Sequence, residues 1–197
     1  DPSAYLDDTY RVSVGHEVTL DDFLEKKGSI DQLHFEACQG IPAKLDKPNI
    51  LDVGCGPGSF IERYFGGVAG ATLIGVEPTV NYHPIMVERG ILPFQFADDC
   101  KDFFGEIDLA FSFHVIEHVE DPVGFLNSIY DLLKPGGVAF IATPNRDDIL
   151  LKVVPEFASF WYRSSHLWYF DRQSIDYVVY KSKFDNHEVS YFHTVDF

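Results

Sequence analysis

Basic residues are scarce in this sequence. Only 15 of the 197 residues are Lys or Arg, whereas 31 are Asp or Glu, so the formal net charge is −16. A field of this sign repels the phosphate backbone of nucleic acids and anionic lipid surfaces. Nucleic acid is therefore a disfavoured partner, although a local basic patch can override the average charge.

Cysteine and long apolar runs are also scarce. The three cysteines, Cys38, Cys55 and Cys100, form no C-x-x-C pair, which favours free thiols in a reducing compartment over a disulfide framework. No apolar run approaches the ~20 residues that span a bilayer, and no basic-then-apolar leader opens the chain. We therefore expect a cytoplasmic protein without a membrane span. Because Asp1 stands where Met is usual, we expect a trimmed start.

The composition that remains is that of a folded domain, with 46% hydrophobic and 15% aromatic residues. Residues 1–47 are polar and mixed, and we predict a cap or lead-in there, with an amphipathic helix over 20–38 that Gly28 interrupts. The rest of the chain, 48–197, is predicted to be the main domain. An aromatic-rich insertion is expected at about 146–170.

Apolar stretches alternate with helical patterns along the main domain. Strands are predicted at about 50–53, 72–76, 92–96, 107–113 and 138–143, with helices over 59–65, from Pro122 onward and over 172–181. Nearly continuous apolar strands separated by helices indicate parallel pairing with both sheet faces covered. The predicted fold is α/β, a Rossmann-like open and mostly parallel sheet with helices on both faces.

A glycine-rich turn joins the first predicted strand to its helix. Gly54, Gly56 and Gly58 lie where a ligand can meet backbone N–H groups, and glycine lets that ligand approach closely. The alternative is a tight turn that binds nothing.

Acidic residues follow the next two strands. Glu77 ends the second strand, where a carboxylate can accept two hydrogen bonds from a ribose diol. Asp98 and Asp99 close the third strand, where a carboxylate can accept from an adenine amino group. The alternatives are a solvated strand-end Glu and an ordinary acidic loop. Together with the glycines, these positions predict a site for an adenosine-containing cofactor.

The motifs ILDVGCGPGSF, FADD, FHVIEHVEDP and LLKPGG, in that order and with a strand ending in Glu77, resemble a class I S-adenosylmethionine-dependent methyltransferase. The resemblance covers about residues 48–145 and favours the small-molecule branch related to ubiquinone and menaquinone biosynthesis. It implies an enzyme that moves a methyl group from S-adenosyl-L-methionine to a small-molecule acceptor, with S-adenosyl-L-homocysteine as product. The accepting atom is expected to be an oxygen of a quinol, phenol, sugar or natural product.

The resemblance also implies which residues contact the cofactor. The residues so assigned are Asp52, Gly54, Cys55, Gly56 and Gly58 at the methionine end, Glu77 at the ribose, Pro78, Asp98 and Asp99 at the adenine, and the backbone of Phe113 and His114 at the methionine amino group. Two alternatives stay open. One is a nicotinamide-dependent oxidoreductase, which the G-x-G-x-G spacing disfavours, and the other is a non-catalytic domain that binds S-adenosylmethionine.

The string His114-Val-Ile-Glu117-His118 also matches H-x-x-E-H, the ligand order of one class of zinc peptidase. Because His114 directly follows a strand and the helix is predicted to start only at Pro122, the two imidazoles are not expected to share a helical face. No metal ligand is therefore predicted. His118 is instead the first candidate for a general base. The alternative is that His118 or Glu117 only fixes the loop, since alignment of donor and acceptor can supply much of the rate.

The aromatic-rich stretch contains Trp161, Tyr162, His166, Trp168, Tyr169 and Phe170. It is predicted to line an acceptor pocket, although core packing or a homodimer surface explains it equally well. His166 is a second, weaker candidate base. Near the end, the sequence predicts one strand over about 188–195. Related domains usually finish with two more strands, so we expect either that the protein continued beyond Phe197 or that the sheet edge is completed otherwise.

Overall fold

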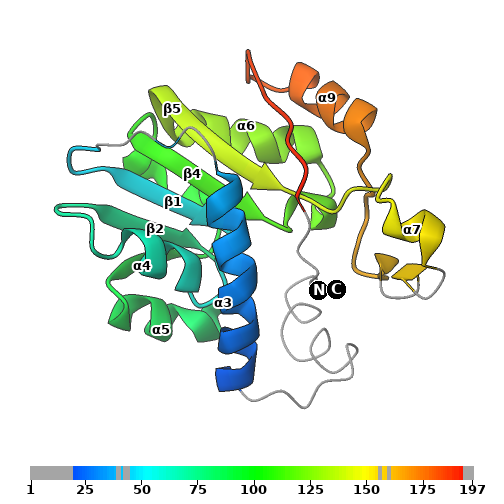
Figure 1. The fold of residues 1–197 in the computed structure, drawn as a ribbon. Coiled ribbons are helices and arrows are strands. Elements are labelled where there is room, and N and C mark those ends of the chain that lie inside the picture. Colours follow the sequence, from blue (N-terminus) through cyan, green and yellow to red (C-terminus); the bar gives the residue numbers. More distant parts are fainter. Residues whose placement is uncertain (1–19, 39–40, 42–44, 155–156, 159–160, 193–197) are drawn as a thin grey trace.

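The computed structural model describes residues 20–38, 41, 45–154, 157–158 and 161–192 of the chain. Its centre is a sheet of five parallel strands in the order β3-β2-β1-β4-β5 (Figure 1). The strands are β1 (Asn49–Val53), β2 (Thr72–Val76), β3 (Ile91–Phe94), β4 (Ile107–Phe113) and β5 (Leu133–Ala142). The predicted fold class is confirmed.

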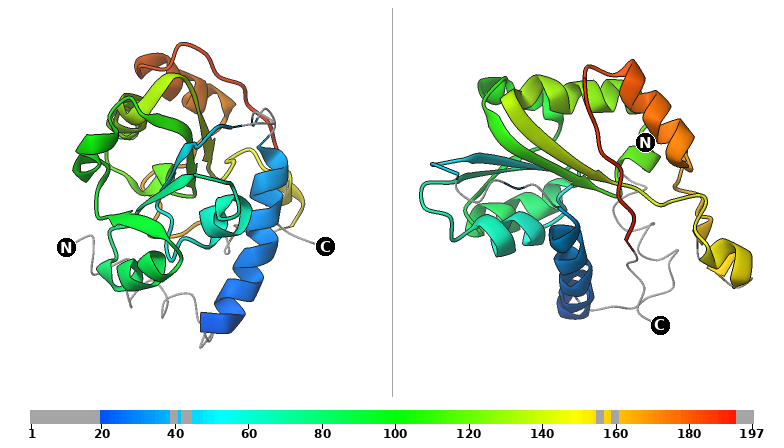
Figure 2. Two further views of the ribbon diagram at one scale, coloured as in Figure 1. Left: turned by 90° about the vertical axis from the view of Figure 1, so that its left-hand side faces the viewer. Right: turned by 45° about the horizontal axis from the view of Figure 1, so that its top comes forward.

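Helices cover both faces of the sheet, as the views in Figure 2 show. The α-helices are α3 (Leu20–Ala37), α4 (Ser59–Phe65), α5 (His83–Glu88), α6 (Pro122–Leu132), α7 (Leu150–Val153) and α9 (Arg172–Lys181). α4 and α5 pack on one face with α3 alongside α4, whereas α6 packs on the other face with α9 beside it. The sheet is therefore the middle of three layers.

The alternation of side chains along the strands builds a separate core on each face. In β1, Ile50 packs toward Phe60 of α4, whereas its neighbour Leu51 packs toward Ile129 of α6. Successive strand residues point to opposite faces, and both faces of this sheet are covered, so neighbouring positions such as Ile50 and Leu51 are both apolar. The continuous apolar runs that predicted the strands have this origin.

Two predicted boundaries were wrong. The helix over 20–38 is not interrupted at Gly28, because Gly28 is where α3 approaches α4. Arg63 Nη1 donates to Gly28 O at 3.2 Å, and a Cβ on Gly28 would lie 2.8 Å from that nitrogen. β5 begins at Leu133 rather than at 138, since Leu133 already pairs with Ile107 before the register shifts.

The predicted strand over 188–195 was also wrong for the part that the structure describes. Residues 188–192 form no strand, and 193–195 lie outside the described residues. This segment instead runs beside β5 and lines a cavity, where the Phe192 ring meets His34 of α3 at 5.6 Å. In the described part, this segment does not pair with the sheet, and it contacts α3 through the Phe192 ring.

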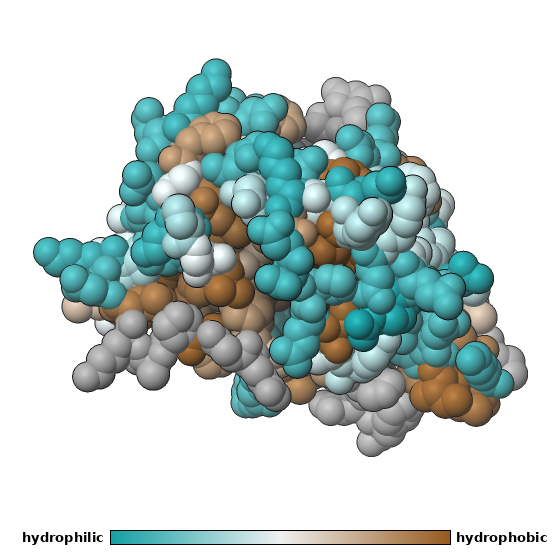
Figure 3. Space-filling model, turned by 90° about the horizontal axis from the view of Figure 1, so that it is seen from above, coloured by the Kyte–Doolittle hydropathy of each residue, from teal (hydrophilic) through white to brown (hydrophobic). Residues whose placement is uncertain are grey.

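The face that Figure 3 shows is mostly hydrophilic, with apolar residues between the polar ones. Within the described residues, no helix combines the length and the apolar character that crossing a bilayer requires. The cysteines Cys38, Cys55 and Cys100 are all buried as free thiols.

Candidate cofactor and acceptor site

The glycine turn after β1 has a backbone that only glycine adopts readily. Gly54, Gly56 and Gly58 have φ angles of 77°, 56° and 77°, in the left-handed region. A Cβ on Gly54 would lie 2.3 Å from Val115 Cγ2, so the loop after β4 approaches the turn closely. The turn therefore needs glycine for its conformation and for the contact with that loop.

Glu77 and the glycine turn meet in one place. Gly56 N donates to Glu77 Oε2 at 2.9 Å, and Thr79 N donates to Glu77 Oε1 at 2.9 Å. The Glu77 side chain is largely buried, with 8% exposure. Because each carboxylate oxygen has two acceptor positions, these bonds fix the orientation of the group and leave capacity for two hydroxyl donors.

The other predicted cofactor residues differ in which of their atoms are accessible to a ligand. The Cys55 side chain is buried in the core, 4.0 Å from Met86 Sδ, so only its backbone can face a ligand. Asp52 is also buried, in β1. Asp99 accepts a hydrogen bond from Phe96 N at 3.0 Å and so shapes its own turn, whereas Asp98 is exposed beside it.

Hydrogen bonds link the ends of neighbouring strands next to the glycine turn and Glu77. Pro78 O accepts from Gln95 Nε2 at 3.4 Å, which links the ends of β2 and β3. The buried Ser112 hydroxyl donates to Val53 O at 3.0 Å, which links β4 to β1. The sequence analysis missed Ser112 because one serine in an apolar strand carries no pattern.

The chain leaves β4 through a strained residue. His114 has φ 58°, and its N–H donates to Ala142 O of β5 at 2.9 Å. An ammonium only donates hydrogen bonds, so the backbone groups at this place that can accept from one are the carbonyl oxygens of Phe113 and His114.

The H-x-x-E-H string does not lie on an α-helix. Residues Ile116–His118 form one 3₁₀ turn, and α6 begins at Pro122 with Asp121 as its cap, whose Oδ1 accepts from Gly124 N at 2.9 Å. The prediction that the string precedes the helix is confirmed.

Glu117 connects this loop to two other segments. Its backbone oxygen accepts from Leu167 N at 2.8 Å, and its Oε2 accepts from the Thr143 hydroxyl at 3.0 Å. Its Oε1 lies 3.5 Å from His114 Nδ1. Burial by itself raises the pKa of the Glu117 carboxyl, but the contact and electrostatic interaction with His114 bring the pKa below its usual value. Glu117 is therefore a buried carboxylate at neutral pH.

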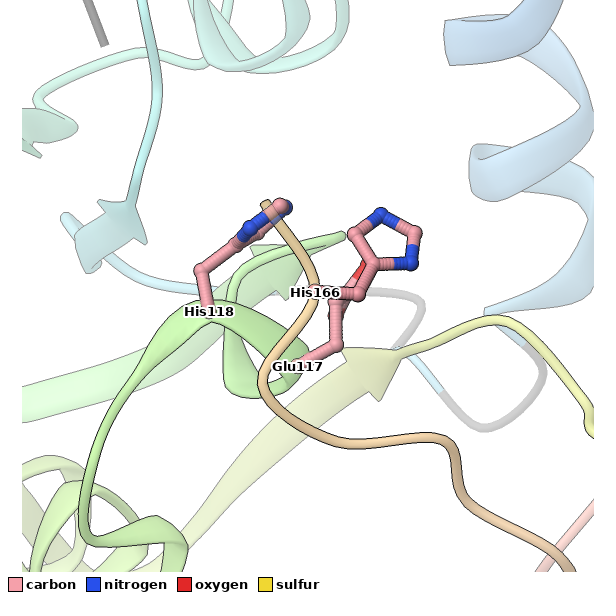
Figure 4. Close-up of side chains that lie close together, drawn as sticks. All are labelled: Glu117, His118 and His166. Carbon is pink, nitrogen blue, oxygen red and sulfur yellow. The ribbon is translucent and has the colours of Figure 1, made fainter. Parts of the chain in front are cut away.

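The structure brings the two candidate bases together. The rings of His118 and His166 lie 4.8 Å apart at 78°, and Glu117 lies beside them (Figure 4). His118 Nδ1 is 2.8 Å from Ser165 O. Burial, followed by the electrostatic interaction with His118, lowers the pKa of His166. Sequence reasoning named both histidines, but nothing in the sequence indicated that they meet.

A cavity of about 410 Å³ lies along the β5 side of this loop. Its wall includes Phe113 and His114 from the end of β4 and Trp161 and Phe170 from the aromatic stretch. Trp168 and Tyr162 are exposed instead, and neither Glu77 nor the glycine turn belongs to the wall. The cavity therefore adjoins the predicted cofactor residues at the end of β4, which is the place expected for an acceptor.

Two parts of the cavity wall were missed by sequence reasoning. His34 of α3 is buried and stacks on Phe113, with ring centroids 4.2 Å apart. The segment 188–192 forms another part of the wall. Neither has a local signal, because each is brought there by packing between distant segments.

Comparison with known proteins identifies similar chains. A family model described as a methyltransferase domain matches residues 26–189. A ubiquinone biosynthesis O-methyltransferase of Dinoroseobacter shibae is 33% identical over 105 residues, which are 50% of this chain and 42% of the relative. One from Vibrio parahaemolyticus is 30% identical over 128 residues, 54% of this chain and 53% of the relative. The chain spans about half the length of these curated relatives.

Solved structures share the fold. A methyltransferase of Thermotoga maritima, described as S-adenosylmethionine-dependent and a possible histamine N-methyltransferase, aligns with a TM-score of 0.61 at 20% identity, over 83% of this chain and 74% of that one. Haemonchus contortus phosphoethanolamine N-methyltransferase 2, solved with S-adenosyl-L-methionine, aligns with a TM-score of 0.62 at 18% identity, over 93% of this chain and 44% of that one. At such identities the likeness concerns the fold alone.

Proposed function

Because this chain belongs to the family of methyltransferase domains, we propose that it transfers a methyl group from S-adenosylmethionine to an oxygen of a small-molecule acceptor. The observation that carries the proposal is the hydrogen bond from Gly56 N to Glu77 Oε2 at 2.9 Å. It puts the glycine turn and the strand-end carboxylate at one point of the sheet edge, where open α/β sheets bind ligands.

Different residues are proposed to contact different parts of the cofactor. S-adenosylmethionine supplies a methyl group on a sulfonium, a good leaving group. The Glu77 carboxylate accepts from the ribose hydroxyls, and the carbonyl oxygens of Phe113 and His114 accept from the methionine ammonium. The net charge of −16 suits a ligand that carries a sulfonium and no phosphate. For the adenine, we propose Pro78 and Asp98, with the neighbouring Asp99, whose Oδ2 also accepts from Phe96 N.

The cavity supports an acceptor with an aromatic ring. Its wall contains Phe113, Phe140, Phe157, Trp161 and Phe170, and apolar walls of this kind with a few polar groups are typical of small-molecule sites. The relatives named for ubiquinone biosynthesis are O-methyltransferases, which favours an oxygen as the accepting atom. A phenol or quinol is therefore the proposed acceptor class. The chain's part is to align the acceptor oxygen with the methyl group.

Methyl transfer to a hydroxyl oxygen also requires a group that accepts the proton of that hydroxyl. The sequence analysis proposed His118, with His166 as second choice, and both stay proposals. Neither ring belongs to the cavity wall, whereas His114 does. The contact of His118 Nδ1 with Ser165 O favours a part in fixing the loop. If His118 is the base, protonation inactivates it in the parent chain at low pH, so His118→Ala lowers kcat least at low pH and most at higher pH.

A labelled-methyl assay tests the proposal. The chain is incubated with methyl-labelled S-adenosylmethionine and either a dihydroxybenzene, a simple alcohol or an amine, and the extracted product is counted. We expect label on the dihydroxybenzene oxygen. Binding of S-adenosylhomocysteine without transfer to any acceptor would support the second candidate, a non-catalytic domain.

We also propose that the protein acts in the cytoplasm, in line with its buried free thiols, and that nucleic acid is not its partner, in line with its charge. A homodimer is a further proposal, based on the exposed aromatic residues Tyr162 and Trp168. Sedimentation of the chain at several concentrations tests it, and a constant monomer mass would contradict it.

A further inference from the structure

Three side chains able to bind a metal ion converge beside the cavity. Glu117 and His118 come from the loop after β4, and His166 comes from the aromatic stretch (Figure 4). Each offers one ligand atom, and these atoms lie within 4.8 Å of one another. Glu117 O also accepts from Leu167 N, next to His166, so a backbone hydrogen bond holds the two segments together.

The ring of His118 is oriented as a ligand. Its Nδ1 is 2.8 Å from the carbonyl oxygen of Ser165. A carbonyl oxygen only accepts, so Nδ1 carries a proton, and in the neutral ring the lone pair is then on Nε2. Metal-binding histidines are usually held in this way, with the second nitrogen donating to a carbonyl or carboxylate.

The other two residues have buried atoms without partners. Among the described residues, Glu117 Oε1 and His166 Nδ1 are buried and make no hydrogen bond. The nearest basic atom to Glu117 Oε1 that the structure records is His114 Nδ1, at 3.5 Å. Buried polar atoms are normally paired, because an unpaired one costs free energy. Two such atoms in one cluster indicate a partner between them.

We propose that Glu117, His118 and His166 bind one divalent transition-metal cation, with Zn²⁺ as the best match. Two imidazoles and one carboxylate are a ligand set of zinc sites that keep a position open. Nitrogen ligands disfavour Mg²⁺ and Ca²⁺, which prefer oxygen. The Thr143 hydroxyl, bonded to Glu117 Oε2 at 3.0 Å, orients the carboxylate.

This site differs from the peptidase pattern in the sequence. The peptidase pattern would use His114 together with His118 on one helix, whereas here the second imidazole is His166, 48 residues further along the chain than His118. The sequence analysis predicted no metal ligand because it tested only the local pair. His114 instead forms the cavity wall next to Glu117.

The open position gives the cation a part in catalysis, and this step rests on the proposed function. His114 and Thr143 both line the cavity and both contact Glu117, so the cation lies next to the wall. A cation held by Glu117, His118 and His166 would lower the pKa of a nearby acceptor hydroxyl, whose proton would pass to water. The oxygen then forms a bond to the methyl carbon while the carbon–sulfur bond breaks, and that electron pair stays on sulfur as a neutral thioether. A ligand histidine cannot also be the base, so this role replaces that of His118.

Cobalt absorption measures the coordination directly. The chelator-treated full chain is titrated with Co²⁺ and then with Zn²⁺ as competitor. We expect one equivalent to bind with visible absorption stronger than that of the aqueous ion, and Zn²⁺ to abolish it. Replacing the orienting residue, in Thr143→Val, is expected to weaken binding about 10- to 100-fold. His166→Ala removes a ligand and is expected to weaken binding by at least about 100-fold.

His187→Ala is the matched control. His187 Nε2 also lies near a carboxylate, 2.6 Å from Asp176 Oδ1, but at an exposed place in the structure. It is expected to leave Co²⁺ binding unchanged. The proposal is overturned if the wild-type chain gives only the spectrum of aqueous Co²⁺, or if His166→Ala binds as the parent does. If His166→Ala does not fold, as judged by circular dichroism, the wild-type spectrum and Thr143→Val decide.

A titration of the same preparations with S-adenosylhomocysteine separates this proposal from the proposed function. Nucleoside binding without Co²⁺ binding contradicts the cation site alone. Co²⁺ binding without nucleoside binding contradicts the cofactor assignment alone.

Discussion

Removing the Glu77 carboxylate tests the cofactor assignment most sharply among the point substitutions. In the proposed complex, this group accepts one hydrogen bond from each ribose hydroxyl while it keeps those from Gly56 N and Thr79 N, both 2.9 Å long. Hydrogen bonds to a charged group contribute about 1.5–3 kcal/mol each. Two lost bonds at the lower end cost about 3 kcal/mol, which is a factor of about 100 in Kd.

The assay is a calorimetric titration of S-adenosylhomocysteine into the parent chain and into Glu77→Ala. The exposed Glu88→Ala, on α5, is the control for a lost negative charge. Glu77→Gln keeps one acceptor oxygen and so loses only one of the two hydrogen bonds to the ribose. Its Kd is therefore expected to rise by only about 10-fold. A folded Glu77→Ala that binds the nucleoside as tightly as Glu88→Ala would refute the reasoning.

Three further predictions concern stability and reactivity. In urea unfolding, Gly54→Ala is expected to lower the free energy of unfolding by more than Gly105→Ala does. Both glycines have positive φ, but only at Gly54 would the new Cβ meet Val115, at 2.3 Å. Equal decreases in the free energy of unfolding would contradict the steric argument. The cost common to both is about 1–2 kcal/mol, from the left-handed backbone. Asp121→Ala removes the cap of α6 and should lower the free energy of unfolding by about 1 kcal/mol; an unchanged urea midpoint would show that the cap contributes nothing. Burial, with the charge of Asp99, raises the pKa of the Cys100 thiol to about 11. Cys100 should therefore resist iodoacetamide at pH 7.5 until urea unfolds the chain, and mass spectrometry that finds it alkylated in the folded state would contradict this.

The sequence predicted the sheet well because its signals are local. β2 and β4 have the predicted bounds, and so do α4 and α9, since each combines an apolar period with a clear start or stop. The meeting of Gly54 and Glu77 was predictable for the same reason: each directly follows a strand, and the carboxyl ends of parallel strands lie at one edge.

What failed depends on contacts between distant segments. Gly28 has the usual mark of a helix break, yet its missing side chain makes room for Arg63 of α4. The alternation over 188–195 is typical of a strand, but residues 188–192 line the cavity instead. The meeting of His166 with His118 also has no local signal, because it depends on how the aromatic stretch folds back on the loop.

A crystal structure of the chain with S-adenosylhomocysteine would test the central claim directly. The account predicts the ribose hydroxyls within hydrogen-bond distance of the Glu77 carboxylate, the homocysteine end at the Gly54–Gly58 turn, and the sulfur directed toward the cavity beside His114. A nucleoside bound elsewhere, or one whose ribose does not reach Glu77, would contradict it.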